Sequence, residues 1–129
     1  MTPYRPDPKT PKPKVNKAYR IWISERRCAV CGAWPPNDPA HQNIDGGKMG
    51  GKADDKWLLP YCRDCHQASE NRVNSGFMTL WQTKRPELWV RGSEDANPAK
   101  GLLFDRLDLR DYIKILCEEY YGLWLSKKR

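Results

Sequence analysis

Long apolar runs are missing from this 129-residue sequence, and its mean hydropathy is only −0.87. No stretch approaches the ~20 apolar residues that cross a bilayer, and the basic N-terminus leads into prolines, not into an apolar signal core. These absences exclude a membrane protein and favour the cytosol. With few aliphatic residues to bury, a core this small is expected to rely on aromatic residues, including six Trp and six Tyr.

Negative charge is also in short supply. The chain carries 23 Lys and Arg against 16 Asp and Glu, a formal net charge of +7. A basic protein of this kind favours a polyanionic partner, because neutralised phosphates release their counterions. Nucleic acid is the leading candidate, and a basic protein without such a partner is the alternative.

The composition changes after residue 14. Residues 1–14 hold five of the eleven prolines among basic residues, so they cannot form a helix or a sheet ladder. We expect a flexible basic arm that either contacts phosphates or is a plain tail. Residues 15–129 are expected to form one domain.

Helical patterns occur near both ends of that domain. Asn16 is a suitable N-cap for a short helix that leads to Cys28 and carries Tyr19, Trp22 and Ile23 on one face. A longer helix is predicted to begin near Asp108, with one apolar stripe. The stripe comprises Leu109, Tyr112, Ile113, Leu116, Tyr120, Leu123 and Trp124. We interpret it as core, with a dimer interface as the alternative.

The middle of the chain predicts shorter elements. Residues 28–65 are rich in Gly and Pro, which favours turns and a β-hairpin. Asp64 and Gln67 have the spacing of a capping box, so a helix over 65–75 is expected, with Gly76 as its stop. Pro86 limits any helix in 77–90, and 91–101 reads as loop.

Five cysteines in a chain expected in a reducing compartment point to metal binding. Cys28-x2-Cys31 and Cys62-x2-Cys65 are two matched pairs whose thiolates can converge on one tetrahedral ion. They predict a structural Zn²⁺ site; four unrelated buried cysteines are the alternative. The fifth, Cys117, fits a core position on the last helix.

Two further groups are candidates for a functional site. His66 and Glu70 are four residues apart on a predicted helix, so both project from one face and can ligate a catalytic metal ion, unless they are an ordinary surface pair. Lys48 and Lys52 lie in and after the run Gly46 to Gly51, which suits either phosphate contact or a hairpin turn. Together with Arg72, these lysines are the candidate nucleic-acid contacts.

Beyond these single features, the order of motifs resembles the HNH (ββα-metal) endonuclease superfamily, and most closely its small phage- and prophage-type members. The resemblance covers about residues 28–72 and leaves some 80 residues unexplained. Four segments carry it, namely Cys28-x2-Cys31-Gly32, Ala40-His41, the glycine-rich stretch that ends in Lys52-Ala53-Asp54-Asp55, and Leu59-Pro60-Tyr61-Cys62-Arg63-Asp64-Cys65-His66.

The resemblance implies an α+β fold with a zinc-stapled ββα core over about residues 28–76 and a helical extension over 77–129. It implies that His41 is the general base and that His66 binds a catalytic divalent ion such as Mg²⁺, Mn²⁺ or a transition ion, with Glu70 supplying a carboxylate. Asp55 is the nearest match to the middle Asn of the motif and would orient the hairpin or assist the metal site. Ala40 departs from the pattern, because it cannot bind metal as the residue before the base often does.

The sequence thus predicts a metal-dependent endonuclease that hydrolyses phosphodiester bonds, in DNA more than in RNA. It would act in the host cytosol if a phage encodes it. A catalytically silent zinc module that binds nucleic acid or a protein partner is the alternative, and Ala40 is the feature that favours it.

Overall fold

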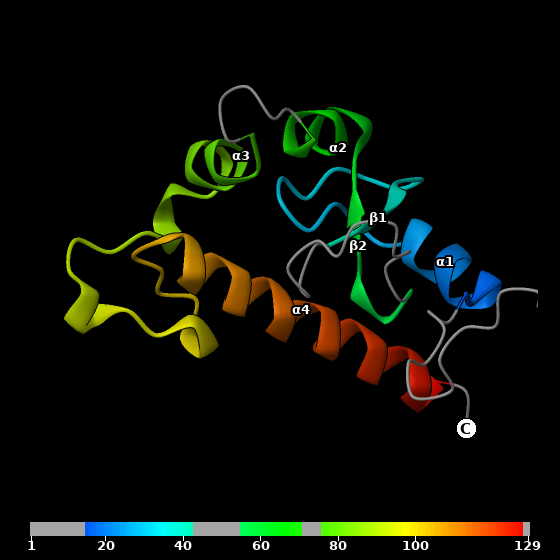
Figure 1. Cartoon of the computed structure of the whole chain (residues 1–129). Coiled ribbons are helices and arrows are strands. Elements are labelled where there is room, and N and C mark those ends of the chain that lie inside the picture. The colour runs from blue at the N-terminus through cyan, green and yellow to red at the C-terminus, as the bar shows by residue number, and fades with distance from the viewer. Residues whose placement is uncertain (1–14, 43–54, 71–75, 128–129) are drawn as a thin grey trace, which may run out of the picture.

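The computed structural model describes residues 15–42, 55–70 and 76–127 (Figure 1). Within these ranges the chain is α+β, as the sequence predicts, with a two-stranded sheet and four α-helices. In chain order the elements are α1 (Lys17–Ser24), β1 (Asp38–His41), β2 (Leu58–Tyr61), α2 (Arg63–Ser69), α3 (Gly76–Lys84) and α4 (Arg106–Lys127). The arm predicted over 1–14 lies outside the described residues.

The sheet is the predicted hairpin, formed by antiparallel β1 and β2 with Asp38 opposite Tyr61 and His41 opposite Leu58. All four residues of β2 are buried, whereas Ala40 alone is buried in β1. Helices α1 and α2 contact both strands, and α4 packs against β2 in addition. This extra helix explains why β2 is the more deeply buried strand. A short 3-10 turn, η1 (Asp55–Trp57), leads directly into β2.

Helix α1 begins as predicted. The Asn16 side chain accepts a hydrogen bond from the Tyr19 amide at 3.0 Å, which satisfies one of the free amides of the first turn. Tyr19 and Ile23 are fully buried and pack with Leu58 and Trp124. The aromatic residues of α1 therefore join the first helix to the end of the last one.

Helix α2 differs from the prediction at both ends. Its N-cap is Cys62, whose sulfur accepts from the Cys65 amide at 3.5 Å, so Asp64 lies inside the first turn and is not the cap. The helix ends at Ser69, and Gly76 opens α3 where a helix stop was predicted. A cysteine that caps a helix carries no strong sequence signal, since Asp and Asn are the usual caps.

The segment after α3 follows the expectation from Pro86. Helix α3 stops at Lys84, and the chain continues in three 3-10 turns, η2 (Pro86–Leu88), η3 (Ser93–Asp95) and η4 (Pro98–Lys100). The region predicted as loop thus contains two short turns, and it projects from the rest of the molecule (Figure 1). Gly101 ends the last turn with φ 74°, a backbone conformation that favours glycine.

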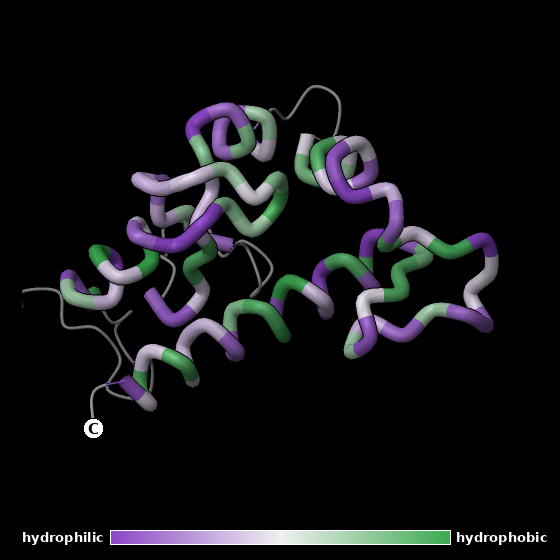
Figure 2. The backbone as a smooth tube through the Cα atoms, turned by 180° about the vertical axis from the view of Figure 1, so that it is seen from behind, coloured by the Kyte–Doolittle hydropathy of each residue, from purple (hydrophilic) through white to green (hydrophobic). Residues whose placement is uncertain are grey.

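Helix α4 begins two residues before the predicted start. Asp105 and Asp108 cap it reciprocally: the Asp108 amide donates to Asp105 Oδ1 at 2.9 Å, and the Asp105 amide donates to Asp108 Oδ2 at 3.2 Å. In Figure 2, hydrophobic and hydrophilic stretches alternate along α4, as expected for a helix with one apolar side.

The stripe on α4 is core for the most part, as predicted. Leu109, Ile113 and Trp124 of the stripe are buried, and Tyr112, Leu116 and Tyr120 are partly buried against the core. Cys117, which was predicted for a core position on this helix, is buried as well. Leu123 was predicted to belong to the stripe, but it is 61% exposed. One step along a helix is a turn of about 100°, so Leu123 points away from the side on which Trp124 is buried. No helix among the described residues is long and apolar enough to cross a membrane.

Candidate functional site

The two cysteine pairs meet, as their spacing predicts. The sulfur atoms of Cys28, Cys31, Cys62 and Cys65 all lie within 4.8 Å of one another, and Cys31 Sγ is 3.6 Å from Cys62 Sγ. Four thiolates around a tetrahedral ion at ~2.3 Å stand about 3.8 Å apart, so the observed spacing fits one ion. All four are free cysteines, not disulfides. These side chains can therefore hold one structural metal ion.

Local backbone structure positions each pair. Cys62 and Cys65 occupy the N-cap and first turn of α2. Cys28 and Cys31 lie on a tight turn, in which the Gly32 amide donates to the Cys28 carbonyl at 2.9 Å and Gly32 has φ 76°. Burial raises the pKa of Cys28, but hydrogen bonds from the backbone around the site outweigh it and lower the pKa to about 7. The turn thus favours a thiolate at Cys28.

His41 is held by a buried carboxylate. His41 Nε2 lies 2.8 Å from Asp55 Oδ1, and Asp55 is 1% exposed. The same carboxylate accepts two hydrogen bonds from Arg20, at 2.7 and 2.8 Å, and one from the Asn16 amide at 2.7 Å. Asp55 therefore joins the end of β1 to the start of α1.

The hydrogen bonds on Asp55 decide its ionisation. Burial alone raises the pKa of Asp55, but the bonds from Arg20, Asn16 and His41 outweigh it and hold the pKa below the ordinary value. An ionised carboxylate only accepts hydrogen bonds, so His41 Nε2 must carry the hydrogen. The other ring nitrogen, Nδ1, is then the acceptor in the neutral ring, and it has no partner among the described residues.

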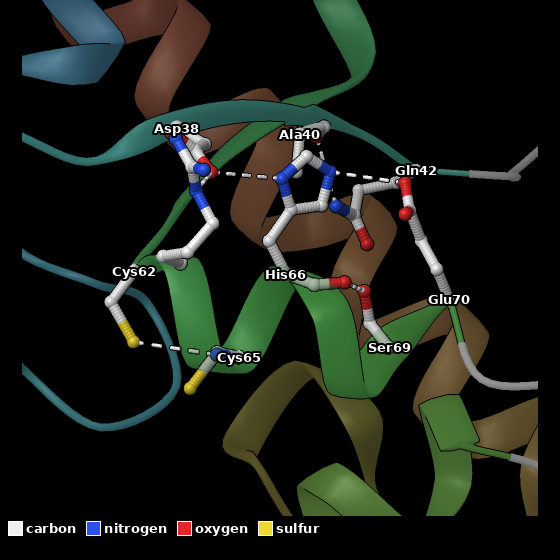
Figure 3. Close-up of polar contacts among 9 residues, drawn as sticks. Asp38, Ala40, Gln42, Cys62, Cys65, His66, Ser69 and Glu70 are labelled. Atoms are coloured by element: carbon white, nitrogen blue, oxygen red, sulfur yellow. Dashed lines mark hydrogen bonds and ion pairs between the residues drawn. The ribbon is translucent and has the colours of Figure 1, made fainter.

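His66 stands between two carboxylates (Figure 3). Its Nδ1 lies 3.1 Å from Asp38 Oδ2 on β1, and its Nε2 lies 3.1 Å from Oε1 of Glu70, the C-cap of α2. The hydrogen bond from His66 is the main cause that lowers the pKa of Asp38, and Arg63 adds to it. Glu70 is 71% exposed. The predicted pair of His66 and Glu70 is thus formed, and Asp38 is a third member that the sequence did not indicate.

The contact of His66 Nδ1 with Asp38 determines what His66 Nε2 can bind. Nδ1 donates to Asp38, because that carboxylate is ionised. The contact between Nε2 and Glu70 is favourable only if the ring carries a second hydrogen or if a cation lies between the two atoms. Two cis ligands at ~2.1 Å from one ion are about 3 Å apart, close to the observed 3.1 Å. The 3.1 Å separation is thus compatible with either a second hydrogen on the ring or a cation held between the two side chains.

The two histidines lie on different sides of β1. Side chains alternate along a strand, so Asp38, Ala40 and Gln42 share the side that faces His66, whereas His41 points toward Asp55. Figure 3 shows the His66 ring beneath the strand, between Asp38 and Gln42.

Some predicted contacts cannot be placed. Lys48, Lys52 and Arg72 lie outside the described residues, as does the glycine-rich run. In the part of the chain that the structure describes, the four cysteines are the one group in which three or more potential ligand atoms converge. Arg20 and Asp38 were both missed, because their partners are 35 and 28 residues away in sequence.

Comparisons with known proteins give a family without an assigned function. A family model described as "Protein of unknown function (DUF968)" matches residues 4–85. The uncharacterized protein YdfU of Escherichia coli (strain K12) is 43% identical over 53 residues, which make up 40% of this chain and 15% of YdfU. The chain thus covers a small part of that relative. No solved structure matches.

These matches correct the family inferred from the sequence. No HNH family model matches the chain, so its assignment to the HNH superfamily is wrong. The motifs that suggested it are short, and each recurs in unrelated proteins with paired cysteines and a histidine at a helix start. The match over residues 4–85 includes both cysteine pairs, both histidines and Asp55. The chain belongs to the DUF968 family of proteins of unknown function.

Proposed function

We propose that this protein is a metal-dependent nuclease that hydrolyses phosphodiester bonds, with His41 as the general base. The observation that carries the proposal is the bond between His41 Nε2 and the buried Asp55, at 2.8 Å. A histidine with one nitrogen tied to an ionised carboxylate has a defined tautomer and a basic second nitrogen. Such a ring can take a proton from a water molecule near neutral pH.

The substrate class follows from charge. A net charge of +7 favours a polyanion, and the phosphodiester backbone of DNA or RNA is the polyanion with a bond that activated water can cleave. We infer DNA as the preferred substrate, in keeping with the expectation from the sequence. Lys48, Lys52 and Arg72 are proposed backbone contacts.

His66 and Glu70 are the proposed ligands of the catalytic metal ion. Asp38 accepts from His66 Nδ1, which leaves Nε2 with its lone pair toward Glu70. One nitrogen and one carboxylate suit a transition ion better than Mg²⁺, which prefers oxygen ligands alone. When bound, the ion would supply positive charge to the phosphate oxygens and the leaving oxygen. His66 and Glu70 hold it, Asp38 orients His66, and His41 handles the proton.

We propose Zn²⁺ as the ion held by the four cysteines. Four thiolates leave no open coordination position, so this ion would be structural. It would tie the turn at Cys28 and Cys31 to the first turn of α2, which carries His66. The structural ion and the proposed catalytic ion would thus have separate roles, but α2 carries a ligand of each, Cys65 and His66.

A catalytically silent zinc module that binds nucleic acid or a partner remains the second candidate. One observation favours it: beyond the four cysteines, the described residues bring no further group of three ligand atoms together. Ala40, on the side of β1 that faces His66, adds a methyl group where a ligand would help.

Nicking of supercoiled plasmid DNA separates the two candidates. The purified full chain is incubated with plasmid, without added metal and with Mg²⁺, Mn²⁺ or Ni²⁺ in turn. The nuclease proposal predicts nicking that depends on the added ion, most strongly with Mn²⁺ or Ni²⁺. Binding without nicking under every condition would instead support the silent module. The His41→Ala chain prepared in parallel controls for contaminating nucleases.

A further inference from the structure

Trp34 is exposed where a large aromatic residue is normally covered. It lies in the loop between the first cysteine pair and β1, and 75% of it is accessible to solvent. Three described tryptophans have a cation over the ring, namely Trp22, Trp34 and Trp57. Trp57 is buried and Trp22 packs against the core, so Trp34 alone of these three presents its ring to solvent.

Arg27 covers one face of the Trp34 ring. Its guanidinium carbon lies 3.6 Å from the ring centroid, the distance of a stacked cation–π pair. Because the residue is 75% exposed, the opposite face of the ring is open to solvent. The pair therefore offers one planar apolar face with a positive charge directly behind it.

Asn37 fixes both members of this pair. Asn37 is buried, and its side-chain nitrogen donates to the carbonyls of Arg26 at 2.8 Å and Ala33 at 3.1 Å, the residues just before Arg27 and Trp34. The Ala33 carbonyl also accepts from the Cys28 amide at 3.0 Å, which ties the loop to the metal-binding turn. The backbone beneath the exposed ring is thus held in place before any ligand binds.

We propose that Trp34 and Arg27 form a stacking platform for an unpaired nucleobase of a single-stranded nucleic acid. A flat aromatic face stacks on any base, and the positive charge behind the ring adds attraction for the phosphate backbone of the strand. Bases inside a duplex already stack on both faces, so the platform selects an unpaired nucleotide. This inference rests on the proposed function for its substrate class, but it concerns binding and not cleavage.

The test compares Trp34→Leu with Trp34→Phe in the full chain. Leucine keeps an apolar side chain but has no ring, whereas phenylalanine keeps a ring. The probes are labelled oligo(dT) and oligo(rU) of about 15 nucleotides and a DNA hairpin duplex, and binding is measured without added divalent ion. Trp34→Leu should bind the single strands roughly 5- to 100-fold more weakly, while Trp34→Phe keeps most of the affinity. Duplex binding should change little.

Two controls isolate the ring from general effects. Ile21→Ala removes an exposed apolar side chain from α1, and Arg91→Gln removes an exposed charge from the projecting loop. Neither should reproduce the loss specific to single strands. Arg27→Gln should weaken single-strand binding further than Arg91→Gln does. Metal content and the circular dichroism spectrum should match the parent in all variants, since the substituted side chains lie outside the core.

The outcomes are distinct. A selective loss with oligo(dT), with oligo(rU) or with both supports the platform and identifies the sugar it accepts. An equal loss on the duplex, an unchanged affinity in Trp34→Leu, or no single-strand binding by the parent would overturn it. If single-strand binding depends on Trp34 but no metal ion supports nicking, the platform stands and the nuclease proposal fails.

Discussion

The carboxylate of Asp55 stands 2.8 Å from His41 Nε2 and is itself held by Arg20 and by the Asn16 amide at the start of α1. This bond fixes which nitrogen of His41 carries the hydrogen, and thus which nitrogen is free to act as a base. Because Asp55 is buried, water does not compete for it. Through Asp55, the predicted base is connected to Asn16 and Arg20 at the start of α1.

Asp55→Asn should therefore lower the cleavage rate far more than it lowers stability. An amide can present its NH₂ group to His41 and stabilise the wrong tautomer, an effect worth roughly 10²–10⁴ in rate. Metal content should stay the same. Single-turnover cleavage rates measure the predicted loss. Asp64→Asn is the control, because it makes the same change at an exposed carboxylate. Equal rates for Asp55→Asn and the parent would remove Asp55 from the mechanism.

Cys65→Ser should abolish metal binding and unfold the domain, because the free energy of binding at a structural zinc site is of order 10 kcal/mol, as large as the stability of a whole domain. Cys117→Ala is the matched control: this cysteine is buried in α4, outside the metal site, so its loss leaves a small cavity and a full complement of metal. Elemental analysis and thermal unfolding measure both effects. About zero zinc per chain in the parent would refute the four-thiolate site.

Asp38→Ala should weaken the catalytic metal site without destroying it. Loss of a carboxylate that orients a ligating histidine typically costs 10–100-fold in metal affinity. Cleavage by Asp38→Ala should therefore need about that much more metal and recover when the metal is supplied. Arg63→Gln is the control, because Arg63 also bonds Asp38 at 3.1 Å but cannot orient His66. A metal requirement equal to that of the parent would contradict the role of Asp38.

Arg20→Gln tests the electrostatic balance on Asp55. The pKa of Asp55 is lowered in the folded chain, so its contribution to stability is present above the ordinary value of about 3.9 and is lost as pH falls through the lowered value. Without Arg20 the burial penalty dominates and the folded pKa rises. We expect Arg20→Gln to lower the free energy of unfolding by about 1–2 kcal/mol near pH 7. This is less than the loss expected for a fully buried ion pair, because the Arg20 side chain is 39% exposed.

This loss should shrink as the pH falls through the raised pKa of Asp55 in the variant, because protonation relieves the unpaired carboxylate there first. Denaturant unfolding at several pH values, with Arg63→Gln as a surface-pair control, measures the trend. A loss that stays constant or grows on acidification would show that Arg20 stabilises the fold in some other way.

Features with a local sequence signal were predicted correctly. Asn16 caps α1, Pro86 follows the end of α3, and the paired cysteines converge. Each depends on residues a few positions apart or on a fixed ligand spacing. The stripe on α4 was predicted for the same reason, apart from Leu123, since periodicity alone does not separate the edge of an apolar face from its centre.

The polar contacts around the histidines could not be predicted in the same way. Asp38 precedes a proline in an irregular stretch, and nothing local marks it as the partner of a histidine 28 residues later. Arg20 reads as an ordinary charged residue on α1 until η1 brings Asp55 beside it. The cap at Cys62 was missed because a thiol is a weak acceptor and is not among the usual capping groups.

His41→Ala is the most direct test of the proposed function. A general base contributes on the order of 10²–10⁴ in rate without carrying the fold. When variant and parent are compared at the same metal and salt concentrations, the variant should keep the zinc content, the melting temperature and the DNA affinity of the parent. It should lose most of the nicking activity. Nicking by His41→Ala at the rate of the parent would contradict the mechanism, and the silent zinc module would replace it.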